Sequence, residues 1–207
     1  MARKAARRAT RRALRWRRVR ALLAGGAVLG VGASATLAAW NDVEHGSATF
    51  TAGTFGIVGS TDGEGFAEHA TADAPAMLNF QVAPTAMTPG ATTYALFSVR
   101  TTASSVAGTV ELAADAANGA GLGQYLTYGV RTVSSTTCDA AAFAGSSSDV
   151  VASGSVLTTG GAGARSLDAG GGSTVHYCFA VTLRADAPNA AQGAAVSPAW
   201  QFTATAS

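Results

Sequence analysis

Lysine is almost missing from this 207-residue chain: the only one is Lys4. The rest of the chain therefore has no side-chain amine that could form a Schiff base with a carbonyl substrate. Acidic residues are missing from the start, because all 12 of them follow Trp40. The net charge of +2 is thus an average over two unlike pieces. The piece after Trp40 has four arginines against the 12 acids, a balance of −8, which argues against a nucleic-acid-binding surface on it.

Motifs for catalysis and metal binding are missing as well. The three histidines, His45, His69 and His176, are isolated, and no H-E-x-x-H or G-x-S-x-G sequence is present. A Ser/His/Asp set assembled from distant loops stays open, because the many serines carry no information. We expect no catalytic residues, no metal ligands and no cofactor, and interpret each histidine as a surface or sheet-face residue.

Cysteine occurs only twice, at Cys138 and Cys178. Outside the cytosol a lone pair is most simply a disulfide. A pair of metal thiolates is the alternative, but it needs further Cys or His ligands at close spacing, and the sequence has none. We predict a Cys138–Cys178 disulfide, which would stabilise the fold by roughly 3–4 kcal/mol in the chain-entropy model.

Basic residues are concentrated at the start of the chain. Residues 1–20 contain 10 of the 14 Lys and Arg residues, and 20 uncharged residues, Ala21 to Trp40, follow directly. This order is typical of a secretory signal peptide rather than of a DNA-binding arm. The uncharged segment is just long enough to cross a membrane, so a retained transmembrane helix is the alternative, although its glycines favour cleavage. We predict a signal peptide over residues 1–39, with a basic region 1–20 and a hydrophobic region 21–39, and an exported domain over 40–207.

Two features bear on how this signal is processed. Ala33-Ser34-Ala35 is a generic cleavage site, whereas Leu37-Ala38-Ala39 stands directly before the aromatic Trp40. For the export route, Thr10-Arg11-Arg12-Ala13-Leu14 partly matches a twin-arginine motif, and the general secretory route is the alternative.

The run GASATLAAWNDVEHGSATFTAGTF, from Gly32 to Phe55, resembles the signal and mature start of the TasA and camelysin family of bacterial exported proteins. The residues that match are Ala38, Ala39, Trp40, Asn41, Asp42, Ala48, Thr49, Phe50, Gly53, Thr54 and Phe55. The resemblance implies cleavage between Ala39 and Trp40 by a SipW-class signal peptidase. It also implies a jelly-roll sandwich whose subunits assemble into fibres by strand donation.

The rest of the chain reads as short strands separated by turns, without amphipathic helices between them. We predict strands over residues 47–58, 77–82, 92–99, 105–113, 125–133, 149–157, 174–184 and 196–204. In the strand 174–184, the residues Val175, Tyr177, Phe179, Val181 and Leu183 share one face, while His176 and Cys178 lie on the other. Such a pattern is typical of an all-β sandwich of two sheets.

Two connections in this pattern have unusual composition. The acidic stretch 59–76 includes Asp62, Glu64, Glu68, His69 and Asp73. It lacks the spacing of a calcium-binding EF-hand, so we interpret it as a solvated loop. The glycine-rich stretch 158–173 has no lysine and no helix after it, and is predicted to be a long flexible connection rather than a phosphate-binding loop.

These observations predict a secreted or cell-surface structural protein rather than an enzyme. Its partners would be the signal peptidase during export and further copies of the chain in fibres, with no nucleic acid. It would contact a membrane only through residues 21–39 before cleavage. The segment 41–50 either pairs within its own domain or is donated to a neighbouring subunit. The alternatives are a camelysin-like exported metallopeptidase and a ligand-binding surface module anchored by an uncleaved helix.

Overall fold

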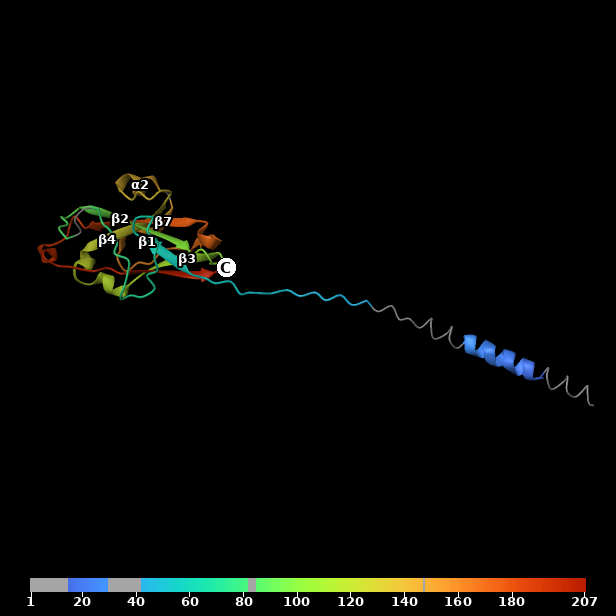
Figure 1. Ribbon diagram of the computed structural model, residues 1–207. Helices are drawn as coiled ribbons and strands as arrows, with labels where there is room; N and C mark the ends of the chain where they lie inside the picture. Colours follow the sequence, from blue (N-terminus) through green and yellow to red (C-terminus); the bar gives the residue numbers. More distant parts are fainter. Residues whose placement is uncertain (1–14, 30–41, 82–84, 147) are drawn as a thin grey trace, which may run out of the picture. The chain divides into compact units, whose positions relative to one another are not determined.

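The computed structural model describes residues 15–29, 42–81, 85–146 and 148–207, and the chain divides into two units, Met1–Phe50 and Thr51–Ser207. In the first unit, residues 15–29 are helical and residues 42–50 have no regular secondary structure. Within these described ranges, no helix combines the length and the apolar character that crossing a membrane requires. The second unit consists of two antiparallel β-sheets and a few short helices (Figure 1). The predicted all-β, two-sheet architecture is confirmed.

Five strands form the larger sheet and three form the smaller one. In the larger sheet the spatial order is β1 (Ile57–Ser60), β2 (Thr92–Thr101), β7 (Thr174–Leu183), β4 (Leu126–Val133) and β5 (Asp149–Val156). In the smaller sheet the order is β6 (Arg165–Leu167), β3 (Gly108–Ala114) and β8 (Trp200–Ala206). Among the described residues of this unit, the helices are α2 (Ala140–Gly145) and four 3₁₀ turns: η1 (Ala116–Gly119), η2 (Gly121–Tyr125), η3 (Ala169–Gly171) and η4 (Asn189–Ala191).

β7 lies at the centre of the larger sheet, between β2 and β4. Its alternating apolar residues Tyr177, Phe179 and Val181 are all buried in the main core. That core also receives Tyr128 and Val130 from β4 and Leu112 from β3. The face of β7 that the sequence pattern predicts to be apolar is therefore the face that packs between the sheets.

A second, smaller core covers the outer face of the larger sheet. Cys178 and Ala180 of β7 and Leu96 of β2 pack there against Phe143 of α2 and Cys138. Each of these residues is buried even though it points away from the smaller sheet. The larger sheet is therefore covered on both faces around β7, which makes this strand the most enclosed part of the fold.

Several predicted elements differ from the observed ones. The first strand begins at Ile57 instead of residue 47, because pairing with β2 starts at Ile57; before it only Thr54 forms an isolated bridge, to Ser105. Residues 77–80 are not in a strand, and residue 82 of that prediction lies outside the described part of the chain. The predicted strands 105–113 and 196–204 are shifted to Gly108–Ala114 and Trp200–Ala206. The glycine-rich stretch contains β6, which pairs with β3, so its interpretation as a flexible connection is wrong at that point.

Candidate functional site

The smaller sheet ends in an open edge at β8. The alternating sequence of this strand turns Trp200, Phe202 and Ala204 toward the main core. Gln201, Thr203 and Thr205 are exposed on the opposite face. One side of β8 pairs with β3 over seven residue pairs, and no described strand pairs with the other side. Unpaired backbone N–H and C=O groups at such an edge form a template for a further strand.

Aromatic side chains stand directly behind this edge. The ring of Phe202 lies 4.8 Å from the ring of Phe97 on β2 and 4.8 Å from that of Tyr177. The Trp200 ring lies 5.0 Å from Phe179. Phe97, Trp200 and Phe202 are only partly buried. An added strand at this edge would therefore bury additional aromatic surface as well as backbone.

The other sheet edges are shorter or occupied. Gly59 of β1 exchanges two hydrogen bonds of 2.9 Å with Ala67, which lies on the side away from β2. At β5, Ala162 N–H donates to the carbonyl of Val150, and the Arg165 guanidinium donates to that of Asp149. β6 has three residues. In the described chain, β8 is thus the longest edge open to a partner.

The segment 42–53, which we call the arm, is the second part of the candidate site. Every residue from 42 to 54 is exposed, and Phe50 retains 91% of its accessible surface. The root of the arm is fixed at Thr54: its carbonyl accepts from Val106 N–H at 2.9 Å, and its hydroxyl donates to Ser104 O at 2.7 Å. Gly53 lies so close to Val106 that a Cβ added there would be 2.5 Å from its Cγ1. These contacts give a physical reason for Gly53 and Thr54 at their positions.

Other residues predicted from the family resemblance have mixed outcomes. Ala39, Trp40 and Asn41 lie outside the described residues, as do residues 30–39 of the predicted hydrophobic region, so the predicted cleavage site stays a prediction. Asp42 is described and exposed.

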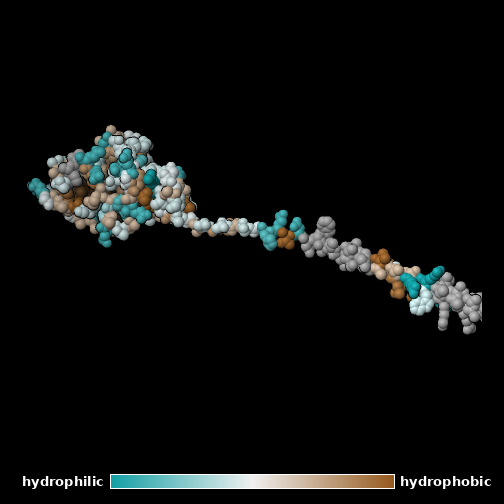
Figure 2. All heavy atoms as spheres, in the orientation of Figure 1, coloured by the Kyte–Doolittle hydropathy of each residue, from teal (hydrophilic) through white to brown (hydrophobic). Residues whose placement is uncertain are grey.

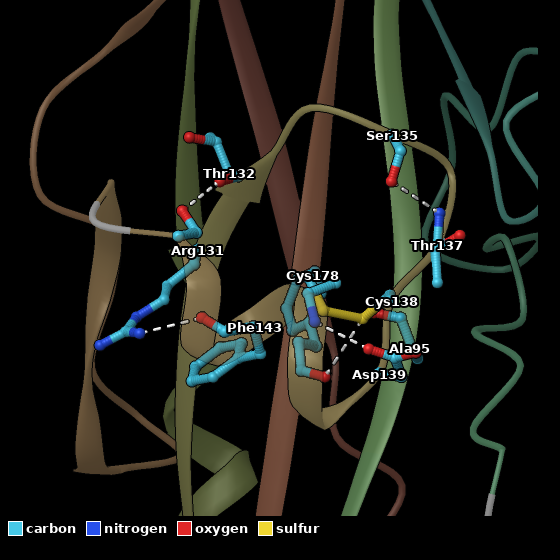
Figure 3. Close-up of a disulfide and its surroundings, with 12 residues drawn as sticks. Ala95, Arg131, Thr132, Ser135, Thr137, Cys138, Asp139, Phe143 and Cys178 are labelled. Carbon is cyan, nitrogen blue, oxygen red and sulfur yellow. Dashed lines mark hydrogen bonds between the residues drawn. A yellow bond between two sulfur atoms is a disulfide. The ribbon is translucent and has the colours of Figure 1, made fainter.

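The predicted disulfide is present. A disulfide joins Cys138 to Cys178, whose Cα atoms lie 5.3 Å apart (Figure 3). Both residues are buried in the second, smaller core on the outer face of the larger sheet. The bond joins β7 to the start of α2, where the Asp139 carboxylate accepts from Ala142 N–H at 2.7 Å. This Asp-Ala-Ala-Ala start is a helix N-cap signal that sequence reasoning missed.

Arg131 connects the same region to the edge strand β5. Its guanidinium donates to Asp149 at 2.7 Å and to the carbonyl of Phe143 at 2.9 Å, as the arrangement in Figure 3 shows for the latter. It also lies 4.7 Å from the Phe143 ring centre. Arg131 therefore lies on the outer face of the sheet and holds α2 against it.

One of the three histidines has a serine partner. His45 and His69 are exposed, whereas His176 is half-buried with its Nδ1 2.7 Å from Ser98 Oγ. Burial lowers the pKa of His176. Ser98 has no exposed surface, so its hydroxyl has no access to a substrate in this structure. Among the described residues no group of three His, Cys, Asp or Glu side chains is placed to hold a metal ion.

The acidic stretch begins with an ordered turn at Asp62. Its Oδ1 accepts from Ser60 Oγ at 2.6 Å and from the N–H groups of Glu64 and Gly65 at 2.8 and 2.9 Å. These bonds, that of Ser60 first, lower the pKa of Asp62 to about 2. Residues 60–65 thus form an ordered turn at the start of the acidic stretch, and Asp62, Glu64, Glu68, His69 and Asp73 are exposed to solvent as expected.

A substitution at Gly63 tests the conformation of this turn. Its φ is +84°, and a Cβ added there would lie 2.3 Å from Thr136 Cγ2. We expect Gly63→Ala to lower the free energy of unfolding by about 1–2 kcal/mol, because the alanine is strained and displaces Thr136. Urea unfolding measures this, with Gly145→Ala as the control, since nothing lies within 4 Å of its Cβ position. Equal stability of both variants would contradict the turn.

The sequence was also compared with known proteins. No family model matches the chain, and no curated protein matches it.

Proposed function

We propose that this chain is an exported structural protein of the cell envelope or extracellular matrix, whose copies associate by strand addition. The arm of one copy pairs with the open β8 edge of the next. The observation that carries the proposal is the coexistence of an exposed strand-capable arm with a seven-residue unpaired edge in the same chain. Backbone hydrogen bonds supply affinity in such strand addition, and alternate side chains supply specificity.

Export is supported by the basic and apolar regions of residues 1–39 and by the resemblance around Ala39 and Trp40. A SipW-class signal peptidase is then the processing partner, and residues 21–39 are the membrane contact before cleavage. The Cys138–Cys178 disulfide fits an oxidising compartment, where such bonds persist. The concentration of basic residues before Ala21 leaves an acidic domain, which disfavours nucleic acid as a partner.

The jelly-roll form of the sandwich is supported by the strand order. β7 lies between the early strands β2 and β4, and β6 lies beside β3. In a jelly roll, late strands return in the same way to lie beside early ones in both sheets. The surface of the sandwich in Figure 2 is mostly polar or weakly apolar, with small brown areas, as expected for a face in contact with water.

The arm matches β8 in pattern and length. Ala48, Phe50 and Ala52 alternate with Thr49 and Thr51, so an extended arm has one apolar and one polar face. The apolar face would lie toward the partly buried aromatic residues, and the threonines would continue the polar outer face of β8. At about 3.3 Å per residue the twelve-residue arm spans about 40 Å, more than the seven-residue strand needs.

Electron microscopy and sedimentation velocity of the chain beginning at Trp40 test this proposal. We expect filaments or a concentration-dependent series of oligomers. Monomers that persist after long incubation at high concentration would contradict it.

The arm variant with the clearest expectation is Phe50→Ser. We expect it to weaken association at least tenfold. The reason is that burying the largest apolar side chain of the arm against β8 contributes about 1.5–3 kcal/mol, and serine loses this contribution. Thr49→Ser, on the opposite face, is the matched control and should associate like the unchanged chain. Sedimentation velocity over a concentration series measures both. Equal losses from the two variants would argue against an alternating, edge-paired arm.

A further inference from the structure

The open edge of β8 has none of the features that usually keep free strand edges apart. Charged side chains, proline and β-bulges prevent pairing between the edges of neighbouring molecules. From Trp200 to Ala206 the sequence contains no charged residue and no proline, and the pairing with β3 runs without a shift in register. The edge is therefore regular and uncharged, and nothing in its own sequence repels a second strand.

The backbone groups on the open side of β8 belong to its even-numbered residues. Two bonds next to the strand fix this assignment: Ala199 C=O accepts from Asp115 N–H, and Ser207 N–H donates to Ala107 C=O, each at 3.1 Å. In a regular antiparallel strand, alternate residues turn both backbone groups to the same side. Odd-numbered residues therefore face β3. The residues whose N–H and C=O groups face away from β3 are Trp200, Phe202, Ala204 and Ala206.

The core-facing side chains of β8 differ in size on the two sides of its middle residue, Thr203. Those before it, Trp200 and Phe202, are aromatic, and those after it, Ala204 and Ala206, are alanines. Antiparallel pairing with a second β8, centred on Thr203, places Trp200 opposite Ala206. It also places Phe202 opposite Ala204. Each aromatic ring then has a small neighbour across the new contact, so the edge is complementary to itself.

This register uses the whole edge. A hydrogen-bonded antiparallel pair needs two residues whose backbone groups face each other. Centring on Thr203 pairs even-numbered residues with even-numbered ones along all seven positions of β8. Centring on Phe202 or Ala204 shortens the overlap, and a slip of one residue turns every side chain to the wrong face. Backbone direction and side-chain size thus select the same arrangement.

We propose that two copies of the chain pair through their β8 edges, antiparallel and centred on Thr203, and that this symmetric dimer competes with the arm for the edge. Each copy contributes the same surface, as in other twofold interfaces. The contact joins the two three-stranded sheets into one continuous sheet. The dimer does not need the arm, so it goes beyond the proposed strand addition. A copy whose β8 is paired in this way has no free edge to accept an arm.

Charge does not oppose the dimer. The strands of the smaller sheet contain one acidic residue, Glu111 of β3, directly opposite Thr203. Across the dimer, the two Glu111 residues are separated by three strand spacings of about 4.8 Å, roughly 14 Å in all. This distance exceeds the Debye length of about 8 Å at physiological ionic strength. Their repulsion is therefore largely screened.

The arm and a second β8 bring different side chains to the edge. Trp200 and Phe202 already pack against the main core of their own chain, whereas Phe50 of the arm is almost fully exposed. Arm addition therefore buries more new apolar surface and is the stronger of the two associations. Phe50→Ser removes this advantage and leaves the dimer as the main remaining association.

Disulfide crosslinking in the full-length chain tests the dimer. The backbone groups of Thr203 face β3, so its pair across the dimer is not hydrogen-bonded. The Cα atoms of such a pair lie about 4.5 Å apart, within the disulfide range of about 4.4–6.8 Å. With oxidised glutathione and Phe50→Ser present, we expect Thr203→Cys to form covalent dimers at least about tenfold faster than Gln201→Cys, whose two copies lie about 14 Å apart.

Two exposed positions on the same face of β8 provide matched controls. Gln201 and Thr205 face each other across the dimer, so Gln201→Cys mixed with Thr205→Cys should crosslink although neither does so alone. Peptide mass spectrometry identifies the joined positions. The native cysteines, Cys138 and Cys178, are buried in their own disulfide and do not compete.

Equal crosslinking rates for Thr203→Cys, Gln201→Cys and Thr205→Cys, each tested alone, would overturn the dimer. The filament test of strand addition is a separate readout. Filaments without crosslinks at position 203 would keep the proposed function and reject the dimer. Crosslinks at position 203 in a chain that forms no filaments would support the dimer and reject arm addition.

Discussion

Replacing Cys138 and Cys178 together by alanine is expected to lower the free energy of unfolding by about 4 kcal/mol, the chain-entropy value for a loop of this size. The two cysteines are 40 residues apart in sequence, and their bond fastens α2 and the preceding loop to the central strand β7. The loss is large against the 5–15 kcal/mol that typically separates the folded and unfolded states.

Urea unfolding without reductant measures this loss. The unchanged chain unfolded with and without reductant provides the control, because its oxidised form should have the higher midpoint. A double variant within 1 kcal/mol of the unchanged chain would contradict a structural role for the disulfide.

The second large effect is expected from Phe179→Ala. Phe179 is 0% exposed on β7, and its ring lies 5.0 Å from that of Trp200. Truncation leaves a cavity between the two sheets and should cost about 3–5 kcal/mol. Thermal unfolding should then occur about 10 °C lower for a domain of this size.

Met77→Ala is the control for this truncation. Met77 is 77% exposed, so its shortening should change stability by about 0.5 kcal/mol or less. Similar losses from both variants would mean that β7 is not the centre of the core.

Strand patterns with a strong period could be predicted from the sequence. The alternation in β7 and the β-branched and aromatic run of β2 indicate both strands and the faces they bury. The pairing of Cys138 with Cys178 follows because no other cysteine competes. The local sequence pattern is therefore enough to predict a strand whose own residues alternate strongly.

Elements that depend on a distant partner could not be predicted in this way. Arg165–Leu167 has only three residues in a glycine-rich setting, and becomes β6 because β3 offers an edge. Residues 47–53 alternate between polar and apolar side chains, as a strand does, but they pair with no strand in the described part of the chain. The Ser98–His176 contact joins residues 78 apart, which no spacing rule indicates.

One part of the candidate site, the arm, could be predicted from the sequence, and the other part, the β8 edge, could not. Composition identified the arm as strand-capable, with Phe50 as its largest apolar residue. That β8 is the open edge follows from the observed order β6-β3-β8 and from the contacts that occupy the edges of β1 and β5. Those facts are properties of the tertiary structure.

The most direct test of strand addition is an isotope-coded photo-crosslink. A photoreactive amino acid is placed at position 50 in ¹⁵N-labelled chains beginning at Trp40, which are mixed with unlabelled chains that carry Phe50 and then irradiated. We predict crosslinked peptides that join a labelled arm to an unlabelled segment 200–207. Crosslinks from the arm only to its own labelled chain, or to segments other than β8, would contradict the account.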